Sequence, residues 1–105
     1  MSGMDNTSYT ITKVTAAAYT MTTNDSVLLC DPSGGAITIT VPQAGADWQS
    51  GRPFFVRTTG TTNSVTITPT TSTIDGGATL VLASGAVHGV MFVSDGTNYF
   101  SIVKS

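Results

Sequence analysis

The chain has 105 residues, of which 10% are charged and 40% hydrophobic, with a formal net charge of −2. This length suits one small domain, and the four scattered basic residues do not form the basic stripe of a nucleic-acid-binding protein. No apolar run approaches the roughly 18 residues of a membrane span, and residues 1–6 lack the regions of a signal peptide. With a single cysteine as well, we expect a protein made in a reducing cytoplasm that binds neither nucleic acid nor a membrane.

Threonine dominates the composition: it occurs twenty times and Ser eleven times, while Glu is absent. Threonine is β-branched, so it suits a pleated, half-buried surface better than a helix. Alternating hydrophobic runs argue against disorder. The composition therefore predicts an all-β domain.

In the first part of the chain, residues 1–8 are expected to form an N-terminal arm and residues 9–105 a single β domain. Residues 7–14 alternate between apolar and hydroxyl side chains, as a strand does. The segment 16–23 reads as a short connection. A turn then leads into the short apolar strand 27–30.

The middle of the chain contains two further strands. After the turn cluster at 31–35, residues 36–41 form a strand whose Ile and Val side chains point one way and whose Thr side chains point the other. Pro42 ends this strand. Residues 43–52 are the only long irregular piece, and 54–58 form the next strand.

The last part of the chain contains four strands. Residues 65–68 and 79–83 are separated by Asp75-Gly76-Gly77, which suits a tight reversal. Residues 87–94 are apolar at almost every position, which predicts burial on both faces, and Asp95-Gly96 joins them to 99–103 as a hairpin. We therefore predict an antiparallel β-sandwich or barrel of about eight short strands with no significant helix.

Two sequence patterns suggest repetition. Residues 36–42 resemble residues 64–69, but a solenoid requires at least three repeats, so we interpret them as two similar strands. Several Thr-x-Thr pairs resemble flat ice-binding faces. Their uneven spacing along the chain predicts that they do not stack in register, and ordinary strand chemistry explains them.

Few residues could carry chemistry. His88 is the only histidine and Cys30 the only cysteine, and each is interpreted as a packing residue because a base or a nucleophile needs a partner. Four aspartates adjoin Ser, Pro or Gly, where Asp side chains bond to the local backbone in turns; these are Asp25, Asp31, Asp75 and Asp95. No Asp-x-Asp spacing indicates calcium. The sequence therefore predicts no enzyme, no metal and no cofactor.

Aromatic residues and Arg are enriched where proteins meet. The candidate interface residues are Tyr9, Trp48, Arg52, Phe54, Phe55 and Tyr99. Core packing is the alternative for Phe54 and Phe55, whereas Trp48 lies among small and polar residues in the irregular segment.

Six short motifs occur in an order that resembles a β-domain of tailed-phage virion proteins, found in tail fibres and in small head proteins. The resemblance covers residues 22–103. The motifs are Asp25-Ser-Val-Leu-Leu, Gly34-Gly-Ala-Ile-Thr-Ile-Thr-Val-Pro, Gly51-Arg, Asn63-Ser-Val-Thr-Ile-Thr-Pro, Thr73-Ile-Asp-Gly and Val93-Ser-Asp-Gly-Thr-Asn-Tyr. The resemblance implies a virion structural role, commonly as a trimer, without catalysis.

In fibre proteins such a domain usually ends a long chain with a repetitive shaft, whereas here only residues 1–21 precede it. This difference favours a capsid decoration (cement) protein that binds the major capsid protein on the outer capsid surface as a homotrimer. The alternative is a tail-fibre or spike tip that binds a host-surface glycan or receptor, with aromatic side chains stacking on sugar rings.

Overall fold

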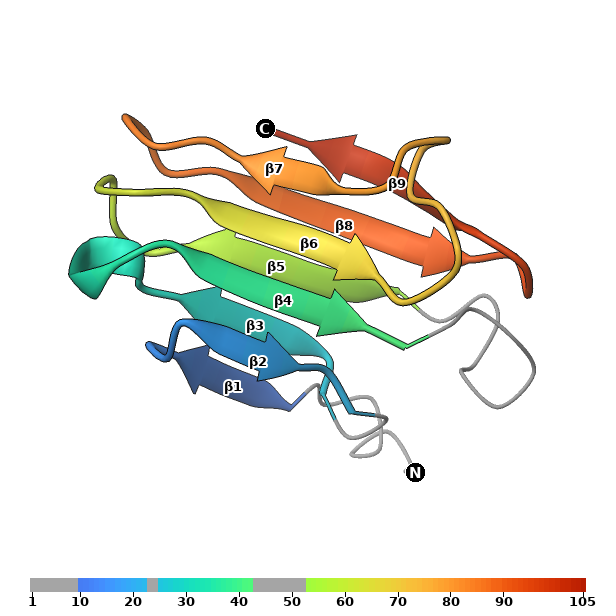
Figure 1. Cartoon of the computed structure of the whole chain (residues 1–105), viewed down its shortest axis with the longest axis horizontal. Coiled ribbons are helices and arrows are strands. Elements are labelled where there is room, and N and C mark those ends of the chain that lie inside the picture. Colours follow the sequence, from blue (N-terminus) through green and yellow to red (C-terminus); the bar gives the residue numbers. More distant parts are fainter. Residues whose placement is uncertain (1–9, 23–24, 43–52) are drawn as a thin grey trace, which may run out of the picture.

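In the computed structural model, which describes residues 10–22, 25–42 and 53–105, nine strands form two sheets that pack against each other (Figure 1). The five-stranded sheet has the order β1-β3-β5-β8-β9 and the four-stranded sheet the order β2-β4-β6-β7. The strands are β1 (Ile11–Val14), β2 (Ala18–Thr20), β3 (Val27–Cys30), β4 (Ile37–Val41), β5 (Phe54–Thr58), β6 (Val65–Pro69), β7 (Leu80–Leu82), β8 (Gly89–Ser94) and β9 (Tyr99–Lys104). The predicted all-β sandwich is confirmed, while the predicted arm at residues 1–8 lies outside the described residues.

Alternating side chains explain why these segments form half-buried strands. In β4, Ile37, Ile39 and Val41 are buried, whereas Thr38 and Thr40 point to the outer side of the sheet. β3, β5, β6, β7 and β8 repeat this period of two, because each sheet turns one side towards the other sheet.

The predicted antiparallel pairing is wrong for the pairs that the first six strands make with one another. The chain crosses to the other sheet after each strand from β1 to β5, so successive strands of one sheet run in the same direction. β1, β3 and β5 are therefore parallel, as are β2, β4 and β6. Among the described strands, the antiparallel pairs are β5-β8, β6-β7 and β8-β9.

The similarity between residues 36–42 and 64–69 marks neighbouring strands. β4 and β6 are parallel, with Ile37 opposite Val65 and Ile39 opposite Ile67. The strand pairs β1-β2, β3-β4 and β5-β6 thus form three stacked coils within the described residues. The two similar strands are therefore paired neighbours in successive coils, an arrangement that the dismissal of a repeat did not predict. The connection predicted at 16–23 is corrected, because it contains β2.

Turn chemistry was predicted more closely. Asp75 and Gly76 have φ angles of 54° and 80°, and Ile74 and Gly77 exchange backbone hydrogen bonds across them. Asp95-Gly96 begins the reversal between β8 and β9, and Gly96 has a φ of 97°. Within the described residues the helical structure is the 3₁₀ turn η2 (Pro32–Gly34), capped by Asp31.

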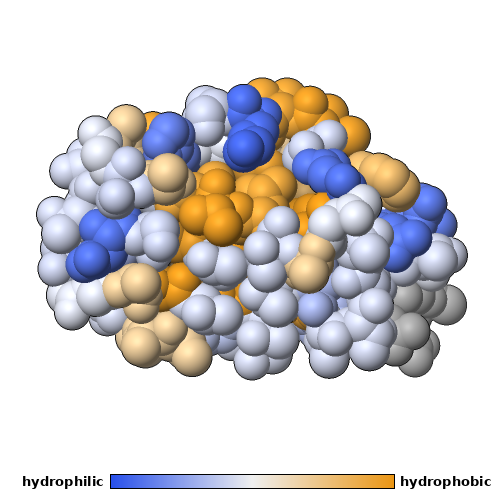
Figure 2. All heavy atoms as spheres, turned by 45° about the horizontal axis from the view of Figure 1, so that its top comes forward, coloured by the Kyte–Doolittle hydropathy of each residue, from blue (hydrophilic) through white to orange (hydrophobic). Residues whose placement is uncertain are grey.

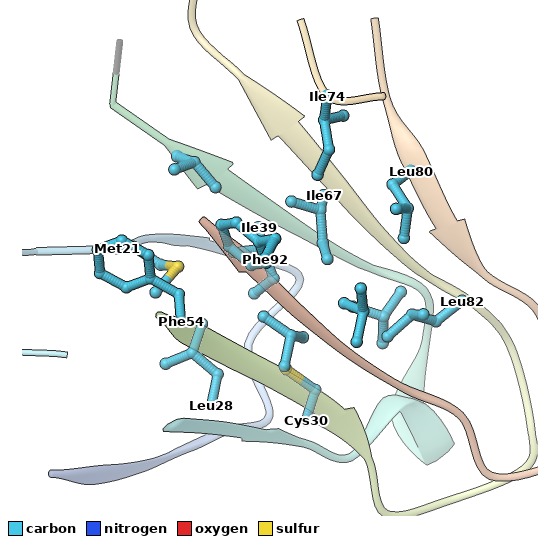
Figure 3. Packing of buried hydrophobic residues seen from close by; sticks show 14 of the residues in the cluster. Met21, Leu28, Cys30, Ile39, Phe54, Ile67, Ile74, Leu80, Leu82 and Phe92 are labelled. Carbon is cyan, nitrogen blue, oxygen red and sulfur yellow. The ribbon is translucent and has the colours of Figure 1, made fainter. Parts of the chain in front are cut away.

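The core lies between the sheets, and both contribute large side chains to it (Figure 3). Phe54 and Phe92 stack with ring centroids 5.6 Å apart, and Tyr99 meets Phe92 edge-on at 5.7 Å. The Tyr99 hydroxyl donates to the backbone oxygen of Pro42, so its polar group is satisfied although the side chain is buried.

The described residues contain no helix of the length and hydrophobicity that crossing a membrane requires.

Candidate interaction faces of the two sheets

The outer side of the five-stranded sheet carries a continuous apolar row. The row crosses all five strands in register and consists of Ile11, Val27, Phe55, Met91 and Val103. We call this row the apolar face. Its end members Ile11 and Val103 are 60% and 63% exposed, and its three middle members are half-buried.

The apolar face is hollowed. A cavity of about 650 Å³ opens there, and Val27, Phe55, Met91 and Val103 are among its lining residues. The adjacent row contains Lys13, Leu29, Arg57 and Gly89 in register. The two cations in this row therefore lie on one side of the apolar row.

Hydrophobic exposure continues onto the end of the stack where β7 and β9 form the sheet edges. Figure 2 turns this end towards the viewer and shows hydrophobic side chains in the middle of the surface and along its upper rim. Of the six large hydrophobic residues that are exposed within the described segments, five belong to this end of the chain. These are Val81, Val87, Phe100, Ile102 and Val103.

The outer side of the four-stranded sheet carries hydroxyl groups. Its two rows, which we call the threonine face, contain Ala18, Thr38, Thr66 and Val81 in one row and Thr20, Thr40 and Thr68 in the next. The prediction that the Thr-x-Thr pairs do not stack in register is wrong for these strands. Unequal loops separate strands that are nonetheless aligned, because loop length does not set the register of a parallel pair. Among the described residues, none of these five Thr hydroxyls has a hydrogen-bond partner.

The predicted interface residues fall into three groups. Phe55 lies half-buried on the apolar face and lines its cavity. Phe54 and Tyr99 are buried in the core, so their prediction as interface residues is corrected: alternation turns them inward. Tyr9, Trp48 and Arg52 lie outside the described residues.

Sequence reasoning missed the remaining members of the apolar face. Apolar side chains at both alternating positions were interpreted in 87–94 as burial on both faces, yet the outward Met91 and Val93 are only half-buried. β3 shows the same pattern, with Val27 and Leu29 outward and half-buried. The available signal was that such doubly apolar strands recur, and the fold places β3 and β8 in one sheet, on either side of β5.

Asp25 holds the first coil together. Its carboxylate, on a side chain 4% exposed, accepts hydrogen bonds from Thr12 Oγ1 (2.7 Å), Tyr19 Oη (2.8 Å) and both the backbone N–H (2.8 Å) and the hydroxyl (3.2 Å) of Thr22. Burial alone would raise the pKa of Asp25, but these donors outweigh it and leave the pKa lowered. The hydrogen bond to the carboxylate, with burial, raises the pKa of Tyr19.

The other described aspartates also serve structural roles. Asp31 and Asp95 accept from backbone N–H groups two or three residues on, as predicted for turns. These backbone donors lower the pKa of Asp95, and the N–H group of Asn98 has the largest effect. Asp75 departs from the prediction, because it accepts from the backbone and hydroxyl of Ser101, 26 residues away in β9.

Cys30 and His88 lie in different environments. Cys30 is fully buried (Figure 3), and burial raises the pKa of its thiol to about 11. His88 is partly exposed, and its Nδ1 lies 3.0 Å from the backbone oxygen of Ser105. Cys30 is therefore placed as the core residue that the sequence suggested.

We predict that Cys30 in the folded protein reacts with a thiol reagent at least about 100-fold more slowly than in denaturant, because a buried, protonated thiol is a poor nucleophile. The measurement is the rate of labelling at neutral pH with and without denaturant. A Thr38→Cys variant, whose added thiol lies on the threonine face, is the control and should label at once. Equally fast labelling of Cys30 in both conditions would contradict its placement in the core.

The geometry thus offers two extended contact faces. Within residues 10–22, 25–42 and 53–105, no three His, Cys, Asp or Glu side chains gather where they could hold a metal ion. No protein-family model matches the chain, and no curated protein matches it either.

Proposed function

We propose that this protein is a bacteriophage virion structural protein: a capsid decoration (cement) protein, made in the host cytoplasm, that binds the outer capsid surface as a homotrimer. Its mechanism is contact. It buries apolar surface between its own copies and against the major capsid protein, and so holds neighbouring capsid subunits together. The proposal draws its phage context from the resemblance over residues 22–103.

The apolar face is the observation that carries this proposal. Five apolar side chains in register cross the whole five-stranded sheet, and a contiguous exposed apolar patch of this kind marks an interaction site in a small protein. The scaffold supports rigid docking, since each coil is bonded to the next along its whole strand length. A preformed face loses little conformational entropy on binding.

The test is co-sedimentation of the purified protein with undecorated phage heads. Because apolar contacts are not screened by ions, we expect the protein to pellet with the heads about equally well in low salt and in roughly 1 M salt, where the Debye length is only about 3 Å. A Phe55→Asp variant, which places a charge in the middle of the apolar face, is expected to stay in the supernatant. Wild-type protein that stays in the supernatant at both salt concentrations would contradict the proposal.

The threonine face favours the second candidate, a fibre or spike tip that binds a host-surface glycan. Its five hydroxyls are available to hydrogen-bond sugar hydroxyls, and the face projects no charged side chain from β2, β4, β6 or β7. Fluorescently labelled protein offered both heads and host cells separates the two candidates. A decoration protein should label the heads. A receptor-binding tip should label the host cells, and a Thr40→Lys substitution should abolish that labelling.

A further inference from the structure

The outer edge of β1 lies at one end of the stack of coils (Figure 1). The backbone oxygens of Thr10 and Val14 accept hydrogen bonds of 2.9 Å from the segment that contains β3. Successive residues of a strand turn their backbone groups to opposite edges, so Ile11 and Lys13 turn theirs away from β3. No described residue bonds to these outward groups, which we call the open edge.

The other end of the same sheet is closed. An extended segment lies along the first half of the outer edge of β9, where the N–H of Tyr99 donates to the oxygen of Thr73 at 2.8 Å and the N–H of Asp75 donates to the oxygen of Tyr99 at 3.0 Å. The Asp75 carboxylate accepts from the N–H of Ser101 at 2.8 Å. The open edge of β1 is therefore the end of this sheet that can receive a further strand.

The size and charge of the open edge argue against a second copy of the chain as its partner. The edge is one strand thick and about 13 Å long for four residues, a small part of the roughly 800 Å² that a standard interface takes from each partner. Two copies that met edge to edge would also bring their exposed Lys13 side chains together, and a lysine on an edge strand opposes such pairing.

The side chains of β1 define a different partner. Ile11 ends the apolar row and is 60% exposed, so an added strand would continue this row with an apolar side chain. Lys13 lies two residues along on the same side and forms no ion pair with a described residue, so an Asp or Glu of the added strand would fit beside it. An extended segment with an apolar and an acidic residue two positions apart therefore matches the open edge.

We infer that such a segment of the major capsid protein adds to β1 as a sixth strand of the five-stranded sheet. This inference rests on the proposed function and names the part of the partner that is held and the edge that holds it. The added strand gains main-chain hydrogen bonds, while its alternate side chains set the register. An exposed ion pair contributes little to affinity, so the binding stays nearly independent of salt.

Replacing Lys13 with Pro tests the inference, because it removes an outward N–H group and leaves the bonds between β1 and β3 in place. In co-sedimentation with undecorated heads, Lys13→Pro is expected to bind about tenfold more weakly than Lys13→Ala, which also loses the charge but keeps the N–H group. Ala18→Pro is the matched control. It removes an outward N–H group from β2, the edge strand of the other sheet, and is expected to bind as wild type does.

Amide hydrogen exchange of the unmodified protein gives a second measurement that needs no variant. When the protein is bound to heads, the N–H groups of Ile11 and Lys13 are expected to exchange more slowly than in the free protein, because each gains a hydrogen bond. The outward N–H groups of Ala18 and Thr20 in β2 are expected to exchange at an unchanged rate.

The outcomes separate this inference from the proposed function. Wild-type protein that pellets with heads, with weaker binding of Lys13→Pro and slower exchange in β1, supports both. Wild-type protein that pellets while Lys13→Pro binds as well as Lys13→Ala, or without slower exchange in β1, overturns strand addition and leaves the capsid-binding function standing. Wild-type protein that stays in the supernatant overturns the function and the inference that rests on it.

Discussion

Replacing Phe92 with Ala is expected to cost about 3–5 kcal/mol of the free energy of unfolding, which is most of the stability of a small domain. Phe92 is fully buried in β8 and lies between Phe54 and Tyr99, at ring-centroid distances of 5.6 and 5.7 Å. Its removal would leave a cavity at the centre of the aromatic cluster, where the sheets have no side chain to fill it.

Urea denaturation followed by fluorescence or circular dichroism measures this loss. Val81→Ala is the control, because Val81 is 47% exposed on the threonine face and its truncation should cost no more than about 0.5 kcal/mol. If the free energy of unfolding of the Phe92→Ala protein lies within about 1 kcal/mol of the wild-type value, Phe92 is not a central packing residue of the core.

Replacing Asp25 with Ala is expected to cost about 3 kcal/mol. The substitution removes a carboxylate that accepts from Thr12, Tyr19 and Thr22, so these donors lose their partner in a buried setting. Asp95→Asn is the control, since Asp95 is exposed and serves a local turn. Equal stabilities of the Asp25→Ala and Asp95→Asn proteins would contradict the structural role of Asp25.

The pH dependence follows from the lowered pKa of Asp25. A carboxyl group with a lower pKa in the folded state contributes stability that is fully present above its ordinary value of 3.8 and is lost as the pH falls through the folded-state pKa. Wild type should therefore lose stability on acidification below that value. An Asp25→Asn variant should show a flatter acid limb, and an unchanged limb would mean that other carboxyl groups set it.

Strand positions were largely predictable from the sequence. Periodicity located β3 and β5 at their observed bounds and β4 within a residue, because alternating Val, Ile, Phe and Thr side chains record which side of a strand faces the core. β2 was missed because its three residues, Ala18–Thr20, are too short to show a period.

Strand direction was not predictable in the same way. Alternation looks identical in parallel and antiparallel strands, so it does not distinguish a meander from stacked coils. The decisive clue was the similarity of β4 and β6, whose residues pair one to one. Two similar segments alone do not indicate a repeat. In the first coil the similarity continues only at Thr20, which lies opposite Thr40.

The interaction faces were harder still to predict, since they depend on strand order. Phe54 and Phe55 are neighbours in sequence, and only the direction in which β5 turns decides that Phe55 faces outward. Val27, Phe55 and Met91 come from three distant segments that register brings into one row. Residue type suggested which side chains could form an interface, but sheet order decides which of them lie together on one face.

Sedimentation equilibrium of the unmodified protein tests most directly whether these faces form protein–protein contacts. If copies pack through the apolar face, the measured mass should be about three times the 10.8 kDa of one chain, and Phe55→Asp should reduce it to that of one chain. A wild-type mass of 10.8 kDa at every concentration, with heads left unbound, would contradict the account.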